Sequence, residues 1–157
     1  MTLRLWRVLF AEAEDRALEP VTSPEGRFHH DGQRALYACL TPEGAATSLT
    51  RYLRPDDPPR VMVPLGCEGG RLFDIDAEDA GPPRDVAMHR WDKDRVAGRR
   101  PPTWDLSDRL RARGYHGLIY PSRLRPDRRN IVLFRWSDPG TPRLFRLGPA
   151  RPWVPPR

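Results

Sequence analysis

The densest group of potentially reactive side chains lies near residue 30. Arg27, His29 and His30 surround the turn signal Asp31-Gly32, and Tyr37 follows on an apolar segment. A guanidinium binds phosphate through two parallel hydrogen bonds, and an aromatic face stacks on a planar ring. These residue types therefore suit a ligand that carries both a phosphate group and a ring.

We expect Arg27 and Tyr37 to lie on two extended segments joined by the Asp31-Gly32 turn. An Asp-Gly pair favours a tight hairpin, which would bring both side chains to one cleft. Arg27–His30 is then a short extended segment. The alternative for the two residues is an ordinary surface arginine and an ordinary core tyrosine.

Two other groups invite a metal or acid–base interpretation. His29 and His30 are adjacent, so on a strand they face opposite sides, and we expect one of them to face a ligand and neither to bind a metal. Asp74 and Asp76 fall on one face of a strand and could bind a metal or exchange protons, or simply face solvent. The chain has no nucleophile elbow, phosphate-binding loop or HExxH motif.

The pattern of apolar residues predicts a single α+β domain with more strand than helix, built on central antiparallel or mixed β-sheets. Alternating or continuous apolar runs bounded by turn residues indicate strands. The predicted strands are Leu3–Phe10, Ala35–Leu40, Val61–Cys67, Arg71–Ile75, Gly117–Tyr120, Asn130–Trp136 and, at an edge, Thr141–Leu147.

Two helices have clear boundaries. Thr41-Pro42-Glu43 supplies a cap, a proline for the first turn and an acidic residue, and the helix should end before Pro55. Thr103–Arg113 is the second helix, capped by Thr103 and ended by Gly114. The sequence between residues 86 and 98 has mixed character and predicts no single element.

Composition limits the class of protein. The chain has 157 residues, a net charge of +6 and one lysine, Lys93. Such a balance suits an acidic ligand, an acidic partner or nucleic acid, although a bias toward arginine codons explains it equally well. Nineteen prolines mark loops, and residues 148–157 are expected to form a proline-rich arm after a domain of residues 1–147.

Cys39 and Cys67 lie in apolar strands without a metal-ligand spacing, which predicts buried free thiols in a reducing compartment. No signal peptide or membrane-spanning apolar run is visible. We therefore expect a cytoplasmic protein that does not contact a membrane.

The order of these motifs resembles the RES-domain proteins, which are toxins of toxin–antitoxin pairs. The family has a Gly-Arg segment, a glycine turn, a Tyr-Ala strand and an alanine-rich helix, followed near the C-terminus by an apolar strand, Pro-Ser and Asn before a second apolar strand. The matching residues are Gly26-Arg27, Gly32, Tyr37-Ala38, Ala45-Ala46, Gly117–Ser122 and Asn130–Phe134.

The resemblance implies a fold like that of ADP-ribosyltransferase toxins and chemistry on NAD, with no metal. Such an enzyme cleaves the nicotinamide–ribose bond and passes ADP-ribose to a protein, water or phosphate. The family arginine, tyrosine and serine correspond to Arg27, Tyr37 and Ser122. The NAD contacts expected on this basis also include His29, His30 and Arg51. The implied partners are an antitoxin that occludes the active site and a protein that accepts ADP-ribose.

One position departs from the family pattern. Where the family has a glutamate on the helix, this chain has Ser48, and we group Ser48 with the catalytic residues. The nearest carboxylate, Glu43, is more than a helical turn away. The last glutamate is Glu78, which excludes a late catalytic glutamate. A catalytically weakened binding protein and a basic nucleic-acid-binding domain therefore remain alternatives, although nucleic acid is expected only through the antitoxin.

Overall fold

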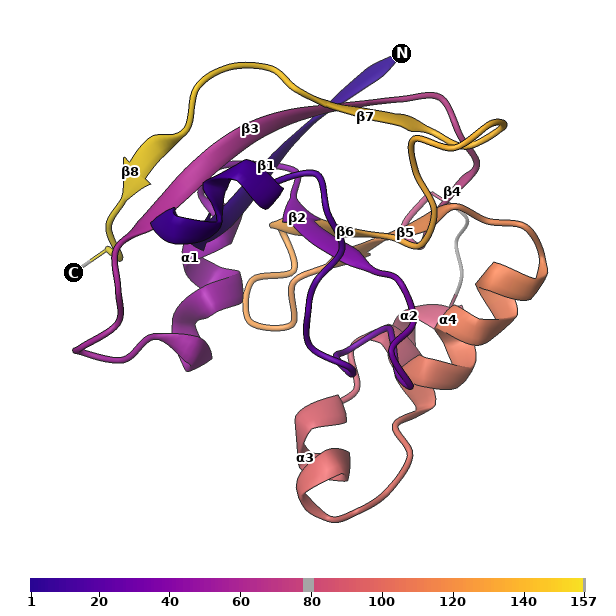
Figure 1. Cartoon of the computed structure of the whole chain (residues 1–157). Helices are drawn as coiled ribbons and strands as arrows, with labels where there is room; N and C mark the ends of the chain where they lie inside the picture. Colours follow the sequence, from indigo (N-terminus) through magenta and orange to yellow (C-terminus); the bar gives the residue numbers. More distant parts are fainter. Residues whose placement is uncertain (78–80, 157) are drawn as a thin grey trace.

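The computed structural model describes residues 1–77 and 81–156, with Arg51 and Gly81 described by their backbone only. The strands are β1 (Thr2–Phe10), β2 (Leu36–Cys39), β3 (Arg60–Glu68), β4 (Leu72–Asp74), β5 (Gly117–Pro121), β6 (Arg129–Leu133), β7 (Arg143–Arg146) and β8 (Arg151–Trp153). The helices are α1 (Gly44–Leu49), α2 (Gly81–Ala87), α3 (Trp91–Val96) and α4 (Pro102–Ala112), with the 3-10 turns η1 (Ala11–Arg16) and η2 (Thr50–Tyr52) (Figure 1).

The strands form one mixed sheet in the order β4-β5-β6-β2-β1-β3-β7, with β8 paired to the first part of β3. All pairs are antiparallel except β4–β5. The predicted α+β class with a mixed sheet and few helices is confirmed.

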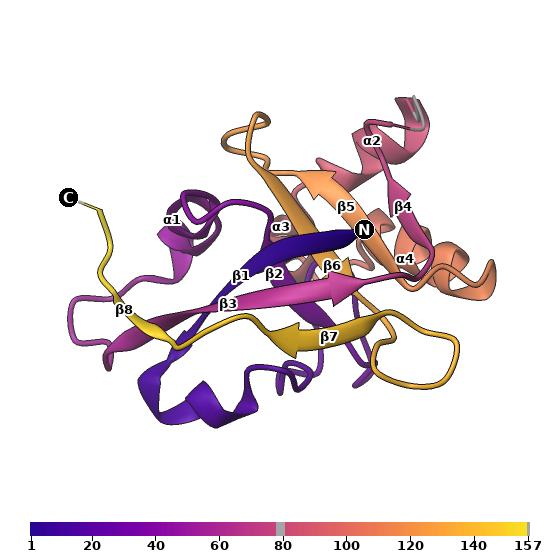
Figure 2. The same ribbon diagram turned by 90° about the horizontal axis from the view of Figure 1, so that it is seen from above.

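The sheet changes direction between β1 and β2. β1 pairs with β3 from Thr2 to Phe10, but it pairs with β2 only where Trp6 faces Cys39. Figure 2 shows β1, β3 and β7 running across the direction of β5 and β6. The two halves of the sheet therefore meet at one narrow junction.

Alternate strand residues build two cores on opposite faces of the sheet. Ile119 and Ile131 pack in one cluster with Leu5. Leu118 and Val132 pack in the other cluster, which lies between the sheet on one side and α4 and the 26–33 segment on the other. Burial of each such side chain contributes roughly 1.5–3 kcal/mol, so the pattern of period two largely determines the scaffold.

The predicted strands appear close to their expected positions, but Arg27–His30 is not extended. Gly26 N–H donates to His29 O at 2.9 Å, which closes a tight turn. The predicted hairpin between this segment and β2 is therefore wrong, because β2 pairs with β6 and β1 instead. The turn at Asp31-Gly32 is confirmed, with φ angles of 52° and 71°.

The helices differ from the prediction mainly at their starts. α1 begins at Gly44 and has no side-chain cap, so the predicted cap Thr41 is wrong. α4 begins at Pro102, and the hydroxyl of Thr103 is buried inside it rather than capping it. Its end at Gly114 is confirmed by a φ of +82°. The unassigned stretch 86–98 contains the end of α2 and all of α3.

The last residues are partly ordered against the sheet. Arg151–Trp153 form β8, which pairs with Arg60–Met62 of β3. Within the described residues, no helix is both long and apolar enough to cross a bilayer. Glu78 lies outside the described residues.

Candidate functional site

A cleft of about 790 Å³ lies beside the junction of the two half-sheets. Its walls come from the second half of β1, η1, the 26–29 turn, β2, α1 and the segment after β5. A volume of this size accommodates a nucleotide-like ligand. Five of the predicted site residues line it: Arg27, His29, Tyr37, Ser48 and Ser122. His30 does not, and the side chain of Arg51 lies outside the described part of the chain.

The hydroxyl of Tyr37 is fixed by two hydrogen bonds. Phe28 N–H donates to Tyr37 Oη at 2.9 Å, so the tyrosine proton is directed to His29 Nδ1 at 2.8 Å. His29 Nε2–H then donates to Ser23 O at 3.0 Å. Burial lowers the pKa of His29, although the bond to Ser23 opposes this shift. These hydrogen bonds indicate that His29 is neutral and that it orients Tyr37. Both of its ring nitrogens are used in this way, so His29 does not reach out to a ligand.

Gly26 is required by close packing in this network. A Cβ atom at Gly26 would lie 2.5 Å from His29 Cε1 and 3.2 Å from Tyr37 Oη. The carbonyl of Gly26 also accepts a 2.7 Å hydrogen bond from Trp104 Nε1 on α4. The turn is therefore held by packing against His29 and Tyr37 and by a hydrogen bond from Trp104, which is distant in sequence.

Arg27 places a positive charge at the cleft. Its guanidinium carbon lies 4.9 Å from the centre of the Tyr120 ring and 5.3 Å from that of Phe28. It also donates a hydrogen bond to Ala87 O at the end of α2. Burial raises the pKa of Tyr120, so this ring stays neutral beneath the cation. The guanidinium of Arg27 is therefore held in place by the two aromatic rings and by its hydrogen bond to the end of α2.

Ser48, Ser122 and Asn130 line the cleft with polar groups, and we call them the polar wall. Ser48 Oγ donates to Asn130 Oδ1 at 3.3 Å, and it lies 3.7 Å from Cys39 Sγ. Ser122 is buried, and its hydroxyl accepts a long 3.4 Å bond from Arg125 N–H, which leaves its own proton to donate. Burial raises the pKa of Cys39 to about 11, so its thiol is not a ready nucleophile.

Asn130 and Tyr120 line the cleft but were not among the predicted site residues. They face each other across β5 and β6. The signal for Asn130 was present in the sequence, because a polar residue begins an otherwise apolar strand after the Pro121-Ser122 pair. Pairing with Ser48 could not be read from the sequence, since 82 positions separate them.

The carboxylates that line the cleft come from segments other than α1. Glu12, Glu19, Glu25 and Asp92 line it, and Glu43 does not. Glu25 pairs with Arg95 at 3.3 Å. The Ser48 position therefore has no acidic neighbour on its own helix.

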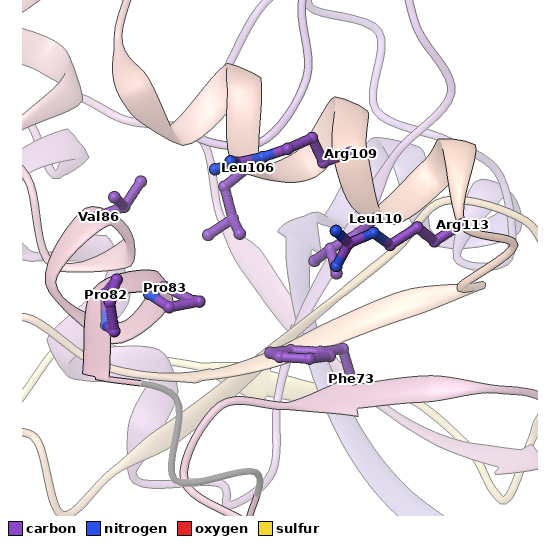
Figure 3. Close-up of a pocket in the computed structure, with 8 residues that line it drawn as sticks. All are labelled: Phe73, Pro82, Pro83, Val86, Leu106, Arg109, Leu110 and Arg113. Carbon is purple, nitrogen blue, oxygen red and sulfur yellow. The ribbon is translucent and has the colours of Figure 1, made fainter.

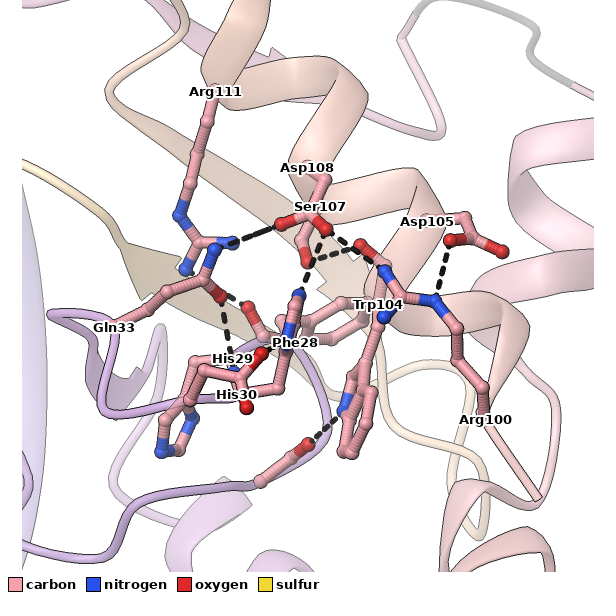
Figure 4. Close-up of polar contacts among 12 residues, drawn as sticks. Phe28, His29, His30, Gln33, Arg100, Trp104, Asp105, Ser107, Asp108 and Arg111 are labelled. Carbon is pink, nitrogen blue, oxygen red and sulfur yellow. Dashed lines mark hydrogen bonds and ion pairs between the residues drawn. The ribbon is translucent and has the colours of Figure 1, made fainter.

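His30 belongs to a separate polar cluster behind the turn, drawn in Figure 4. Its two ring nitrogens lie 2.8 Å from Asp31 and 2.8 Å from Asp108, and its ring stacks on Trp104. Asp108 also accepts from Gln33 Nε2 at 2.9 Å and from Arg100 Nη2 at 3.0 Å. The cluster ties the 30–33 segment to α4 and does not face the cleft.

The paired carboxylates Asp74 and Asp76 serve as ion-pair partners. Arg129 contacts both of them, and Arg84 contacts Asp76. Among the residues that the structure describes, no three His, Cys, Asp or Glu side chains gather as a metal site. Cys39 and Cys67 are buried free thiols, as predicted.

A second, smaller cavity of about 170 Å³ lies between α2, α4 and β4 (Figure 3). Apolar side chains dominate it, with Arg109 and Arg113 at its rim. It shares no lining residue with the larger cleft. The predicted site residues that line a cavity all lie in the larger cleft.

Comparisons with known proteins agree with this architecture. No curated protein sequence matches the chain. A solved structure, the MbcT–MbcA toxin–antitoxin complex of M. tuberculosis, matches with a TM-score of 0.68 and 11% identity, over 99% of this chain and 86% of the other. The family model of the RES domain matches residues 4–154. The chain therefore belongs to the RES domain family.

Proposed function

We propose that this protein is the toxin of a toxin–antitoxin pair and that it cleaves the nicotinamide–ribose bond of NAD. Membership of the RES domain family and the fold shared with a chain of a toxin–antitoxin complex support the first part. The second rests on one observation. Arg27 and Tyr37 line one cleft of about 790 Å³ together with Ser122, which is distant from them in sequence.

In this proposal the guanidinium of Arg27 holds the pyrophosphate or a ribose-side phosphate oxygen. The ring of Tyr37 stacks on nicotinamide and shields the positive centre that develops at the ribose. His29 and Phe28 N–H hold that ring in place through its hydroxyl. Because nicotinamide leaves as a neutral molecule, orientation and electrostatic stabilisation supply most of the rate enhancement.

Ser122 and the Ser48–Asn130 pair would bind ribose hydroxyls or the nicotinamide carboxamide. Ser122 retains a proton to donate, and Asn130 offers an amide. The acceptor of ADP-ribose is a protein, water or phosphate, and the carboxylates of the cleft wall, such as Glu25, are candidates to activate it. A slower enzyme is expected than a relative that keeps glutamate at the Ser48 position.

The direct test is release of nicotinamide from NAD by the purified protein, with and without cell lysate. The wild type should release it, and Arg27→Ala should reduce release at least a hundredfold. Arg34→Ala removes an exposed arginine paired with Asp138 outside the cleft and should behave as wild type. Absence of nicotinamide release under all conditions would overturn the NAD proposal.

Labelled NAD and mass spectrometry of lysate proteins identify the acceptor. Label on a protein indicates transfer, and label only in free ADP-ribose or its phosphate indicates NAD consumption. In the cytoplasm, where we place the protein, expression should arrest growth, and co-expression of a cognate antitoxin that covers the cleft should restore it.

A second candidate is a RES-domain protein that has lost most of its catalytic power and acts by binding. Ser48 in place of the family glutamate favours this reading. It predicts tight binding of ADP-ribose to the cleft without turnover of NAD, which calorimetry and the nicotinamide assay distinguish.

A further inference from the structure

A histidine–aspartate pair lies at the cleft, where the chain passes from α2 to α3. His89 lines the cleft, and its side chain is 45% exposed. Asp94, on α3, is buried, and its Oδ2 atom lies 2.6 Å from His89 Nε2. Neither residue is among those that hold NAD in the proposed function. The presence of this pair at the cleft therefore requires an explanation.

The contact with Asp94 determines which nitrogen of the His89 ring carries the proton. A carboxylate accepts hydrogen bonds, so Nε2 is protonated and donates to Oδ2. In the neutral ring, Nδ1 then keeps its lone pair. Within residues 1–77 and 81–156, no other hydrogen bond or ion pair engages the His89 ring. Nδ1 is thus available to a molecule bound in the cleft.

Asp94 is itself held in place by Arg99. Its Oδ1 atom accepts a 3.1 Å hydrogen bond from Arg99 Nε, and the backbone N–H of Arg99 donates to Asp94 O at 2.8 Å. Both carboxylate oxygens are therefore used, as a buried charge requires. A histidine oriented by a fixed carboxylate is the arrangement that makes an imidazole an effective base.

The segment that carries His89 is tied to the turn that carries Arg27. Arg27 donates a hydrogen bond to Ala87 O, two residues before His89. Further along the chain, Arg95 of α3 pairs with Glu25 at 3.3 Å. His89 therefore lies between two contacts that fasten its segment to the turn with the phosphate-binding cation of the proposed function.

The proposed reaction needs a base that the residues assigned so far do not supply. Ser48 stands where the family has a glutamate, and a hydroxyl does not accept a proton readily at neutral pH. Glu25 and Asp92 line the cleft, but each forms an ion pair with an arginine. Histidine is the side chain most often used as a general base near neutral pH. The chemistry of the cleft therefore favours His89.

We propose that His89 is the general base that activates the acceptor of ADP-ribose and that Asp94 is its positioning residue. The acceptor carries a proton on oxygen, as water and the hydroxyl group of a protein do. Its oxygen bonds to ribose C1′ while the C1′–N bond to nicotinamide breaks, and the electron pair of that bond leaves with nicotinamide. The proton of the acceptor passes to His89 Nδ1 and then to solvent. This proposal rests on the proposed function, since it needs NAD in the cleft.

The test separates activation of the acceptor from the integrity of the cleft. Nicotinamide release from NAD is measured with water alone, with lysate proteins, and with added azide, an anion that attacks ribose without losing a proton. His89→Gln should release nicotinamide roughly a hundredfold more slowly than the wild type in water or lysate. Azide should restore its rate toward that of the wild type and yield ADP-ribosyl azide, which mass spectrometry detects.

Two further variants complete the comparison. Asp94→Asn, which keeps the shape of the side chain but not its charge, should slow release severalfold and should also be rescued by azide. The matched control is His116→Gln, which removes a histidine outside the cleft whose Nδ1 accepts from Arg71 N–H at 2.8 Å. This control should release nicotinamide as the wild type does. Because the His89 side chain is exposed, His89→Gln should fold, which thermal unfolding verifies.

Three results would overturn the assignment of His89. If folded His89→Gln releases nicotinamide as fast as the wild type, the residue is not the base. If it is slow and azide does not accelerate it, His89 only supports the shape of the cleft. In both cases an active wild type leaves the proposed function intact. A wild type that releases no nicotinamide with water, lysate or azide overturns the proposed function, and this proposal with it.

Discussion

Tyr37 Oη lies 2.8 Å from His29 Nδ1, and this contact links the aromatic ring of the cleft to the tight turn that carries Arg27. The backbone N–H of Phe28 completes the arrangement at 2.9 Å. The hydroxyl therefore receives one proton and gives one, and the ring is left with a single favoured orientation. A substitution at Gly26 should consequently alter the cleft, although Gly26 itself is not one of the residues proposed to contact the ligand.

Gly26→Ala should perturb the site directly. The added Cβ would lie 2.5 Å from the His29 ring, so the imidazole must move and release Tyr37. We expect a loss of roughly 1–3 kcal/mol in the free energy of unfolding, as for other overpacked positions, together with a large drop in nicotinamide release. Urea denaturation and the nicotinamide assay measure the two effects.

The control for Gly26 is Gly148→Ala, where the new Cβ would meet its nearest neighbour at 3.8 Å, an ordinary contact. Gly148→Ala should unfold at the wild-type urea concentration. A Gly26→Ala protein with wild-type stability and activity would contradict the packing argument.

His29 should make stability depend on pH in mild acid. Its pKa is lowered in the folded state, chiefly by burial, so the unfolded chain binds the proton more readily. Stability is therefore unaffected by His29 above the ordinary histidine pKa of about 6.5 and falls as the pH drops below it. His29→Gln, which cannot titrate, should flatten this part of the stability–pH curve measured by thermal unfolding. An unchanged slope would show that another group is responsible.

Asp108 should contribute to stability and to the position of the turn. Burial raises its pKa, but hydrogen bonds from Gln33 and His30 outweigh that effect and leave the pKa below the usual value. Its side chain is 34% exposed, so solvent screening reduces the benefit. We expect Asp108→Ala to cost about 1–2 kcal/mol in urea unfolding.

Asp105→Ala serves as the comparison, since this neighbour on α4 has a side chain 60% exposed and pairs with the same Arg100. Its loss should cost no more than about 0.5 kcal/mol. Equal effects of the two substitutions would argue that His30 and Gln33 add nothing to the role of Asp108.

Ser48→Ala should show whether Ser48 binds the substrate or only stabilises the fold. The substitution removes the donor to Asn130 Oδ1, and we expect about 0.5–1.5 kcal/mol of lost stability. If the pair holds the sugar or carboxamide, kcat/KM for nicotinamide release should fall severalfold. Thr50→Ala, which removes an exposed hydroxyl two residues further along the chain on η2, should leave kcat/KM unchanged. Equal kcat/KM values for Ser48→Ala and the wild type would remove Ser48 from the site.

The sequence predicts the scaffold well because strand burial has a local period. Alternating residues in β1 and the apolar runs of β5 and β6 mark their own positions, whatever they pair with. Gly114 likewise marks the end of α4, because glycine readily adopts the positive φ that this position requires. The α1 start was placed too early because cap residues are common in turns that precede a helix without joining it.

The sequence by itself determined the α+β class, the strand positions and the candidates Arg27, Tyr37 and Ser122. Only the tertiary structure decided which side chains share the cleft. It turned His30 toward Asp108 and paired Ser48 with Asn130. The physical reason is the distance along the chain over which each effect acts. Burial periodicity and turn preferences depend on neighbouring residues, whereas the hydrogen bonds of the site join residues that are brought together only by packing of the whole fold.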